Sequence, residues 1–232
     1  MSSVKNTLRV GISSTVTVLG ALSLVASANA AVFITSSPGA PDPGPGAGET
    51  KVITLDSGAP PAGVTLTGDY RIVAGSLPGF YAAPALDRTF YLAVPFDARS
   101  GSATMKFNTF LANQNVTKFS FYWGSVDTYN TLRLINRAGV VTKSVNGAML
   151  PPANGDRTAP GTNRRITFTL TGADQDLGAL RFVSTGRAFE TDTFSFARAV
   201  VPEPTTWGLM IMGFGGAGAM LRARRRHAGA LA

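Results

Sequence analysis

The sequence predicts an all-β protein, an antiparallel β-sandwich of jelly-roll type, and three observations support this. Apolar and polar residues alternate with the period of half-buried strands over residues 118–123 and 165–171. Turn-forming residues separate such runs at roughly every 8–15 positions. Between Lys51 and Val201 no window of about a dozen residues carries the apolar stripe of an amphipathic helix. Short strands without helices are typical of two sheets packed face to face.

The chain begins with the pattern of a secretory signal peptide. Lys5 and Arg9 precede an apolar core over residues 16–26, and Ala28-Asn29-Ala30 provides a cleavage site of the A-x-A type. We therefore expect the secretion machinery to export the chain and residues 1–30 to be removed.

The next segment is dominated by proline and glycine, most densely over residues 36–48. Such a composition predicts a flexible linker, here over 31–50, ahead of a single domain over 51–200. The predicted strands of that domain are 52–55, 64–73 with a turn or bulge at Gly68-Asp69, 89–94, 105–107, 118–123, 131–135, 140–141, 165–171, 180–182 and 189–197.

Charge gives no indication of a nucleic-acid partner, although the formal net charge is +8. Of 21 basic residues six lie close to the two ends of the chain, which leaves 15, and all 13 acidic residues lie between Asp42 and Glu203. The folded part is therefore close to neutral, and we expect no binding to nucleic acid. The six terminal basic residues are Lys5, Arg9, Arg222, Arg224, Arg225 and Arg226.

The composition also argues against an enzyme. The chain has no cysteine, and its one histidine is His227 near the C-terminus. A domain without thiol or imidazole cannot build a Ser-His-Asp triad, a cysteine nucleophile or a histidine-ligated zinc site. Paired carboxylates could serve a glycosidase, but no motif selects a pair. We expect no catalytic residues.

The densest local pattern is residues 121–130, Phe-Tyr-Trp-Gly-Ser-Val-Asp-Thr-Tyr-Asn. One interpretation is a ligand site, in which aromatic rings contact a sugar and polar groups bind its hydroxyls. The other is structural, with Trp123 in the core, Gly124 in a turn and the polar residues capping backbone amides. The candidate ligand-binding residues are Trp123, Asp127, Tyr129 and Asn130.

Two further features complete the domain. Asp174 and Asp176 are a closely spaced acidic pair and are weak candidates for calcium, because the rest of a calcium-binding loop is missing. We therefore expect no metal and no cofactor. The stretch 147–163 contains three prolines and three glycines without repeated apolar positions. A loop of this length is usually either functional or disordered, and the composition favours a disordered loop.

The C-terminal segment, 201–232, combines three signals in order. Pro202-Glu203-Pro204 cannot continue a helix or a strand ladder, which predicts an extended and accessible joint. Trp207 and the apolar run 208–221 follow, and the arginines Arg222, Arg224, Arg225 and Arg226 close the segment. An apolar run ended by arginines predicts a short transmembrane helix whose basic end stays in the cytoplasm.

This combination resembles the C-terminal sorting signal, of PEP-CTERM type, of exosortase-dependent surface proteins of Gram-negative bacteria. The resemblance covers about residues 201–226. It implies a precursor held transiently in the inner membrane, removal of the tail by an exosortase-type enzyme, and delivery to the cell surface or the extracellular matrix of a biofilm. Many members have Trp-Ala-Met-Met where this chain has Trp-Gly-Leu-Met from Trp207, which leaves the subtype of the enzyme open.

Residues 123–130, Trp-Gly-Ser-x-Asp-x-Tyr-Asn, also resemble a motif of one group of these surface proteins. The similarity extends over much of residues 86–140. It implies membership of that group and no catalytic activity. The competing hypothesis is a carbohydrate-binding module at the cell surface, with exopolysaccharide as its partner.

Overall fold

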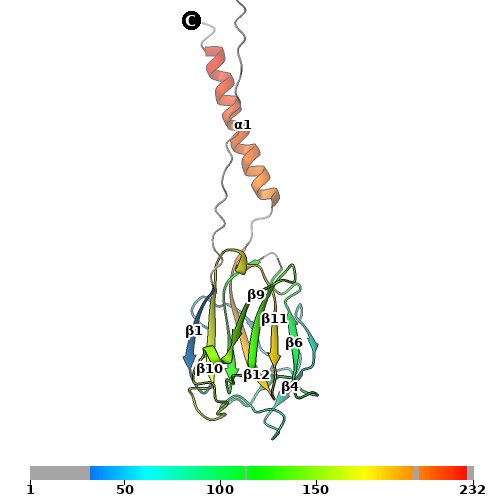
Figure 1. Cartoon of the computed structure of the whole chain (residues 1–232). Coiled ribbons are helices and arrows are strands. Elements are labelled where there is room, and N and C mark those ends of the chain that lie inside the picture. Colours follow the sequence, from blue (N-terminus) through cyan, green and yellow to red (C-terminus); the bar gives the residue numbers. More distant parts are fainter. Residues whose placement is uncertain (1–31, 113, 201–203, 229–232) are drawn as a thin grey trace, which may run out of the picture.

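The computed structural model describes residues 32–112, 114–200 and 204–228. In this part the chain forms two antiparallel sheets packed face to face and one long helix, α1 (Pro204–Ala228), as Figure 1 shows. The predicted all-β sandwich is confirmed, with two single-turn 3-10 helices, η1 (Gly147–Met149) and η2 (Gly172–Gln175), as the other helical segments described.

The larger sheet has seven strands, and each of its pairings is antiparallel. Strand β2 pairs with β12 beyond the end of β5, and the other six lie in the order β1-β10-β7-β12-β5-β4. The strands are β1 (Val32–Pro38), β2 (Lys51–Ile53), β4 (Arg71–Ala74), β5 (Phe90–Val94), β7 (Gln114–Gly124), β10 (Arg164–Leu170) and β12 (Phe189–Val200).

The smaller sheet has five strands in the order β3-β6-β11-β8-β9 and faces the viewer in Figure 1. Its strands are β3 (Thr65–Gly68), β6 (Gly101–Lys106), β8 (Asn130–Asn136), β9 (Val141–Asn146) and β11 (Leu177–Ser184).

The core between the sheets is rich in phenylalanine. The alternating residues Phe119, Phe121 and Trp123 of β7 point inward and are fully buried. The rings of Phe119 and Phe168 stack with centroids 4.4 Å apart, and Phe121 lies 5.8 Å from Phe194. Burial of each such ring stabilises the fold by about 1.5–3 kcal/mol, so the alternation seen in the sequence marks the inner face of the strands.

The prediction of a flexible linker over residues 36–48 is wrong. Strand β1 pairs with β10 from Val32↔Leu170 to Pro38↔Arg164. Farther along, the Asp42 carboxylate lies 2.8 Å from the Arg165 guanidinium, which is an ion pair. The composition suggested a linker because the partners that hold this segment lie more than a hundred residues away in the sequence.

The predicted single strand over residues 64–73 is two strands in different sheets. Strand β3 belongs to the five-stranded sheet and β4 to the seven-stranded sheet. Gly68, with a φ of +102°, ends β3, and a Cβ there would lie 2.3 Å from the Ser102 carbonyl oxygen. The Gly68-Asp69 turn therefore begins a crossing between the sheets.

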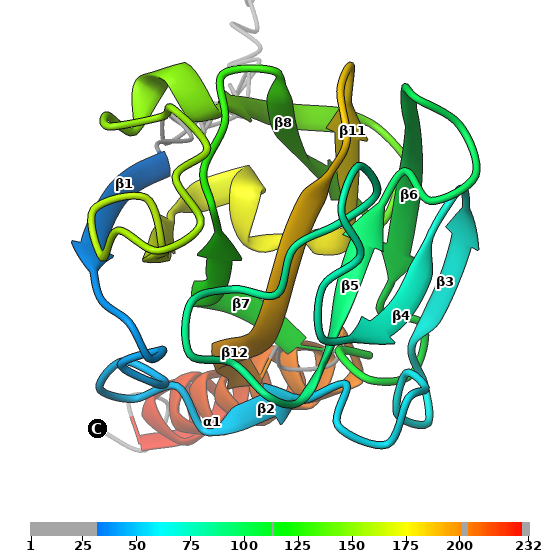
Figure 2. The same cartoon turned by 90° about the horizontal axis from the view of Figure 1, so that it is seen from below.

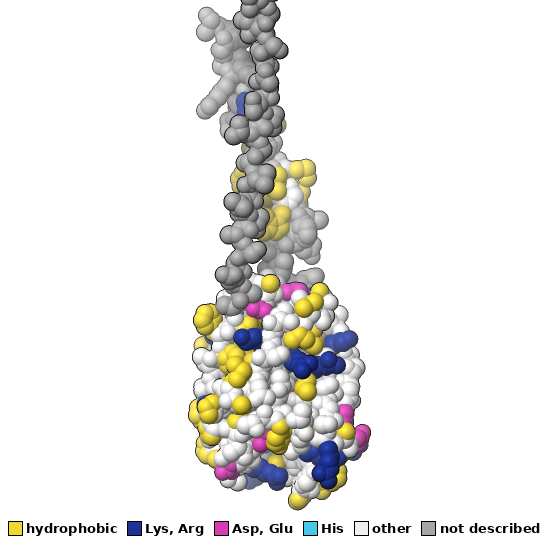
Figure 3. All heavy atoms as spheres, viewed as in Figure 1, with side chains coloured by type: hydrophobic (Ala, Val, Ile, Leu, Met, Phe, Trp, Pro, Cys, Tyr) yellow, Lys and Arg dark blue, Asp and Glu magenta, His cyan; other side chains and the backbone are white. Residues whose placement is uncertain are grey.

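The two outer faces of the sandwich differ. Two segments, 39–50 and 75–89, contact the outer face of the seven-stranded sheet: the Tyr122 hydroxyl donates to the Gly39 carbonyl at 2.6 Å, and the Ala82 amide donates to Glu190 at 2.9 Å. In Figure 2, seen from below, the segment between β4 and β5 crosses β7 and β12. The strands of the five-stranded sheet instead present their outer side chains to solvent, as Figure 3 shows.

Candidate functional site

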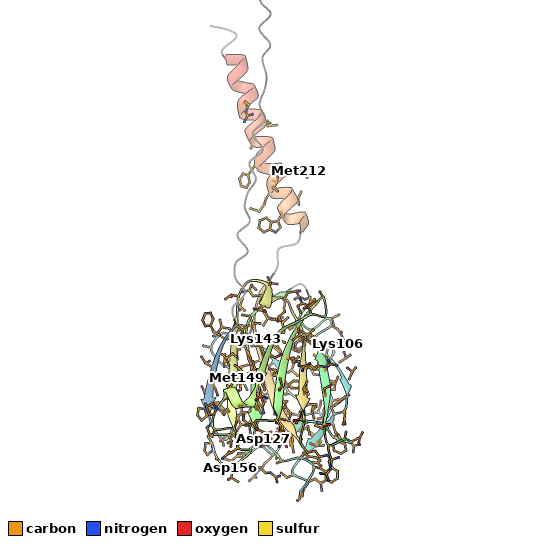
Figure 4. The ribbon with its side chains drawn as sticks, in the orientation of Figure 1. Lys106, Asp127, Lys143, Met149, Asp156 and Met212 are labelled. Atoms are coloured by element: carbon orange, nitrogen blue, oxygen red, sulfur yellow. The ribbon has the colours of Figure 1, made fainter. Side chains whose placement is uncertain are left out.

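The motif of residues 123–130 forms the corner where the chain passes from β7 in one sheet to β8 in the other. Gly124 is required there, because a Cβ would lie 2.8 Å from the ring of Pro84. Ser125 follows with a φ of +43°, an uncommon conformation for a residue other than glycine. The corner lies at the end of the sandwich opposite helix α1, where Asp127 is labelled in Figure 4.

Trp123 does not present its ring to a ligand. Its side chain is fully buried in the core, and its ring stacks on Phe189 with centroids 4.2 Å apart. The suggested contact between this tryptophan and a sugar is therefore wrong, and the structural interpretation holds for this residue. Its position in phase with Phe119 and Phe121 was the signal of burial.

Asn130 is also buried and its amide group is used internally. Its Nδ2 donates to the Ala188 carbonyl oxygen at 3.1 Å, and its Oδ1 accepts from the Ser184 hydroxyl. Tyr129 is half-buried, and its hydroxyl donates to the Arg187 carbonyl at 2.9 Å. These two side chains hold the loop between β11 and β12 against the corner.

Asp127 is half-buried, and burial raises the pKa of its carboxyl, while Tyr129 and the charge of Arg157 lower it in part. Its backbone forms a bridge with Asn154. The carboxylate oxygen Oδ1 lies where a Cβ on Gly155 would be, 2.2 Å away, so the glycine lets the loop approach closely. Of the four predicted ligand residues, Asp127 and Tyr129 alone retain partial exposure.

The loop 147–163 is ordered, contrary to the prediction. The side chain of Asn163 is buried and bridges three segments. Its Oδ1 accepts from the amides of Ala85 at 2.9 Å and Ser125 at 3.2 Å, and its Nδ2 donates to the Ala159 carbonyl at 3.0 Å. Asp156 fixes the middle of the loop by accepting from the Thr158 amide at 2.9 Å. Asparagine and aspartate side chains thus order much of the loop, and Leu150 anchors its first part in the core.

Glu190 is the buried carboxyl of this region. Its Oε1 accepts from the Ala82 amide at 2.9 Å and its Oε2 from the Ser125 hydroxyl at 3.2 Å. Burial raises the pKa of Glu190 to about 8, against the opposing effect of these hydrogen bonds. Glu190 therefore links the corner at Ser125 to segment 75–89 and holds the backbone of that segment in place. Alternation with Phe189 predicts that Glu190 lies on the outer face of β12, but no local pattern indicates that segment 75–89 covers it.

A surface cavity of about 410 Å³ lies beside this corner and combines apolar walls with one acid and one base. Leu86, with a φ of +62° and 73% of its side chain exposed, lines it together with Asp87 and Arg157. The remaining lining residues are Ala40, Ser76, Ala83, Pro84, Ala85, Thr158 and Pro160. The predicted ligand residues do not line this cavity.

The acidic pair shows no metal-binding arrangement. Asp174 is buried in η2, whereas Asp176 forms an ion pair with Arg137. Among the described residues no three of His, Cys, Asp and Glu come together in a way that would hold a metal ion.

The predicted sorting segment follows β12 directly. Pro202 and Glu203 lie outside the described residues, and Pro204 begins helix α1. Trp207 is 60% exposed, and Arg222 is also exposed. The predicted helix is therefore confirmed, and its backbone includes Arg224, Arg225 and Arg226.

The predicted transmembrane span is not confirmed. In the described part of the chain, no helix is both long enough and apolar enough to cross a membrane.

Residues 200–226 match the family model of the PEP-CTERM protein-sorting motif. The match supports an exosortase-dependent protein and covers the segment that the sequence resemblance indicated. It leaves the group defined by the Trp-Gly-Ser motif unconfirmed. No curated protein matches the chain.

Several solved structures are distantly similar to this chain. A family 22 carbohydrate-binding module of Clostridium thermocellum Xyn10B is 15% identical and has a TM-score of 0.34, with 68% of this chain and 98% of that chain covered. TmCBM61, solved with β-1,4-galactotriose, is 13% identical with a TM-score of 0.34, and the coverage is 63% and 94%.

Tailspike protein 4 of bacteriophage CBA120 is 9% identical and has a TM-score of 0.35. The similarity covers 63% of this chain and only a fifth of the tailspike domain (20%). With TM-scores below 0.5, none of these likenesses indicates a function for this chain.

Proposed function

We propose that the chain is an exported bacterial surface protein whose C-terminal tail is removed by an exosortase-type enzyme in the inner membrane. The observation that carries this proposal is the match of residues 200–226 to the PEP-CTERM sorting motif. We infer the finer points, a Gram-negative source and a non-catalytic role in the extracellular matrix or biofilm, from the family resemblance.

The geometry of the joint supports processing at this place. Strand β12 ends at Val200, and helix α1 begins at Pro204. The sandwich leaves the apolar side chains of the helix uncovered, including Ile211 at 71% exposure and Phe214 at 75%; Met212 is labelled in Figure 4. Transfer of apolar side chains out of water is favourable. We therefore propose that the membrane or the processing enzyme covers these side chains.

Two further inferences concern the domain itself. We infer a jelly-roll form, because most neighbouring strands in both sheets are non-consecutive and the chain crosses repeatedly between the sheets. The absence of catalysis rests on a sequence without cysteine, whose one histidine, His227, lies in the tail.

Mass spectrometry of the exported protein tests the sorting proposal. We expect the tail to be lost near residues 202–204, and Glu203→Ala to leave the precursor in the inner membrane fraction. Asp56→Ala is a matched control, because Asp56 is an exposed acid outside the signal. Exported protein that still carries residues 222–226 would refute the proposal.

The second candidate is a carbohydrate-binding module, and one observation favours it: the cavity of about 410 Å³ that joins Leu86 to Asp87 and Arg157. Mixed apolar and polar walls are typical of small-ligand sites. On an array of neutral glycans we would then expect binding that Arg157→Ala weakens about tenfold, the loss of roughly 1.4 kcal/mol. Absence of binding, or binding that Arg157→Ala leaves unchanged, would exclude this site.

A further inference from the structure

The five-stranded sheet carries charge of one sign. Its strands contain four charged residues, Lys106, Arg133, Lys143 and Arg181, and no aspartate or glutamate. The strands of the seven-stranded sheet, by contrast, carry both signs, because Glu190 and Asp192 lie on β12. An otherwise nearly neutral domain thus has a basic side.

The strand register places two arginines directly opposite each other. Arg181 of β11 pairs with Arg133 of β8, and on its other side with Thr104 of β6. Leu180 and Leu132, their neighbours in sequence, are buried in the core, so the two arginines point outward. Like charges opposite each other on a sheet destabilise the pairing, and no carboxylate of the described residues forms an ion pair with either arginine.

These arginines belong to a row of donor groups that spans the whole sheet. Adjacent strands are separated by about 4.8 Å, so five strands extend the row over roughly 19 Å. Lys106 lies in the next row, where it pairs with Thr65 and Ala179. The row runs Thr67, Thr104, Arg181, Arg133 and Ser144.

The charged groups of this side have no partners in the described part of the chain. Arg133, Arg181 and Lys106 take part in no hydrogen bond or ion pair there, whereas Arg137 pairs with Asp176. In Figure 3 basic side chains lie on this face in separate blue patches, and Figure 4 labels Lys106.

We propose that this basic face, defined by Lys106, Arg133 and Arg181, binds an anionic polysaccharide that carries carboxylate groups. A guanidinium group binds a carboxylate through two parallel hydrogen bonds, and neighbouring hydroxyls such as Thr104 can add donors. A straight row across a sheet fits an extended chain. The row contains no apolar side chain that could insert into a lipid surface.

The test is the affinity of the full-length protein, in mild detergent, for immobilised polygalacturonate, with neutral galactan as the reference. We expect the wild type to bind polygalacturonate in preference to galactan and to weaken between 50 and 300 mM NaCl, since ionic contacts are screened. Arg133→Gln with Arg181→Gln should reduce the affinity about tenfold or more.

The matched control is Arg88→Gln with Arg99→Gln, which removes the same charge at two exposed arginines outside the five-stranded sheet. It should change the affinity less than about twofold. Arg133→Lys with Arg181→Lys keeps the charge and loses the paired hydrogen bonds, so its affinity should fall between the wild type and the glutamine variant. Thermal unfolding of each variant verifies the fold.

Four results would overturn the proposal: equal binding to galactan, equal losses in the two glutamine variants, tighter binding to vesicles containing phosphatidylglycerol, or tighter binding to duplex DNA. None of them bears on sorting, which acts on residues 200–226. The basic face and the proposed processing can therefore fail independently.

Discussion

The two outer faces of the sandwich use arginine in opposite ways. On the seven-stranded sheet, Arg165 is 3% exposed, donates from Nε to the Ser120 hydroxyl at 3.0 Å and lies 2.8 Å from Asp42. On the five-stranded sheet, Arg181 is exposed and has no partner in the described residues. Arginine thus stabilises the fold on one face, whereas on the other face it is available to bind a partner.

Covering segments cause this difference. Segments 39–50 and 75–89 bury the carboxyl groups of Glu49, Glu190 and Asp192. Burial raises the pKa of Asp192 to about 7, partly offset by hydrogen bonds from Thr193. Buried charged groups are tolerated only when they are paired or neutralised. The polar groups of this face therefore interact with other parts of the protein and not with an external partner.

The largest expected effect is the loss of Arg165. In Arg165→Met, Asp42 loses its cation and two buried serines lose a donor, so we expect a loss of about 3–5 kcal/mol in the free energy of unfolding. Urea denaturation measures it. Arg181→Met is the matched control on the other face and should change stability by less than about 0.5 kcal/mol. Similar losses in the two variants would contradict the distinction between the faces.

The next effect is a pH dependence from Glu190. Its pKa is about 8 in the fold because of burial and 4.5 in the unfolded chain, so the native state keeps a proton that the unfolded state loses. The contribution to stability is full below pH 4.5 and is lost as pH rises toward about 8. Glu190→Gln should remove this decline and raise stability at pH 8.5, by roughly 2 kcal/mol.

Denaturation of wild type and Glu190→Gln at several pH values between 5 and 9 checks this. The pKa of Asp192 is also raised by burial, so its ionisation also lowers stability as pH rises. The Glu190→Gln variant should therefore keep a smaller decline in stability with pH. Asp56→Asn, a change at an exposed acid, serves as the control. Parallel pH profiles of wild type and Glu190→Gln would show that the carboxyl is already ionised in the fold.

Much of the fold followed from local pattern, and much of the site did not. The period of two identified β7 and β10, because side chains of a strand alternate between faces whatever the strand pairs with. The same phase indicated that Trp123 is buried. The pattern could not show that Asn163 ties three segments together, because its partners Ala85 and Ser125 are distant in sequence.

The sequence by itself determined the all-β class and the C-terminal sorting segment, because periodicity and motif are local properties of the chain. Only the tertiary structure decided that residues 32–50 belong to the sandwich, that Glu190 is covered and that Arg133 faces Arg181. These facts depend on which distant strands pair and in what register. Register therefore determines which charged side chains have partners and which remain free to bind.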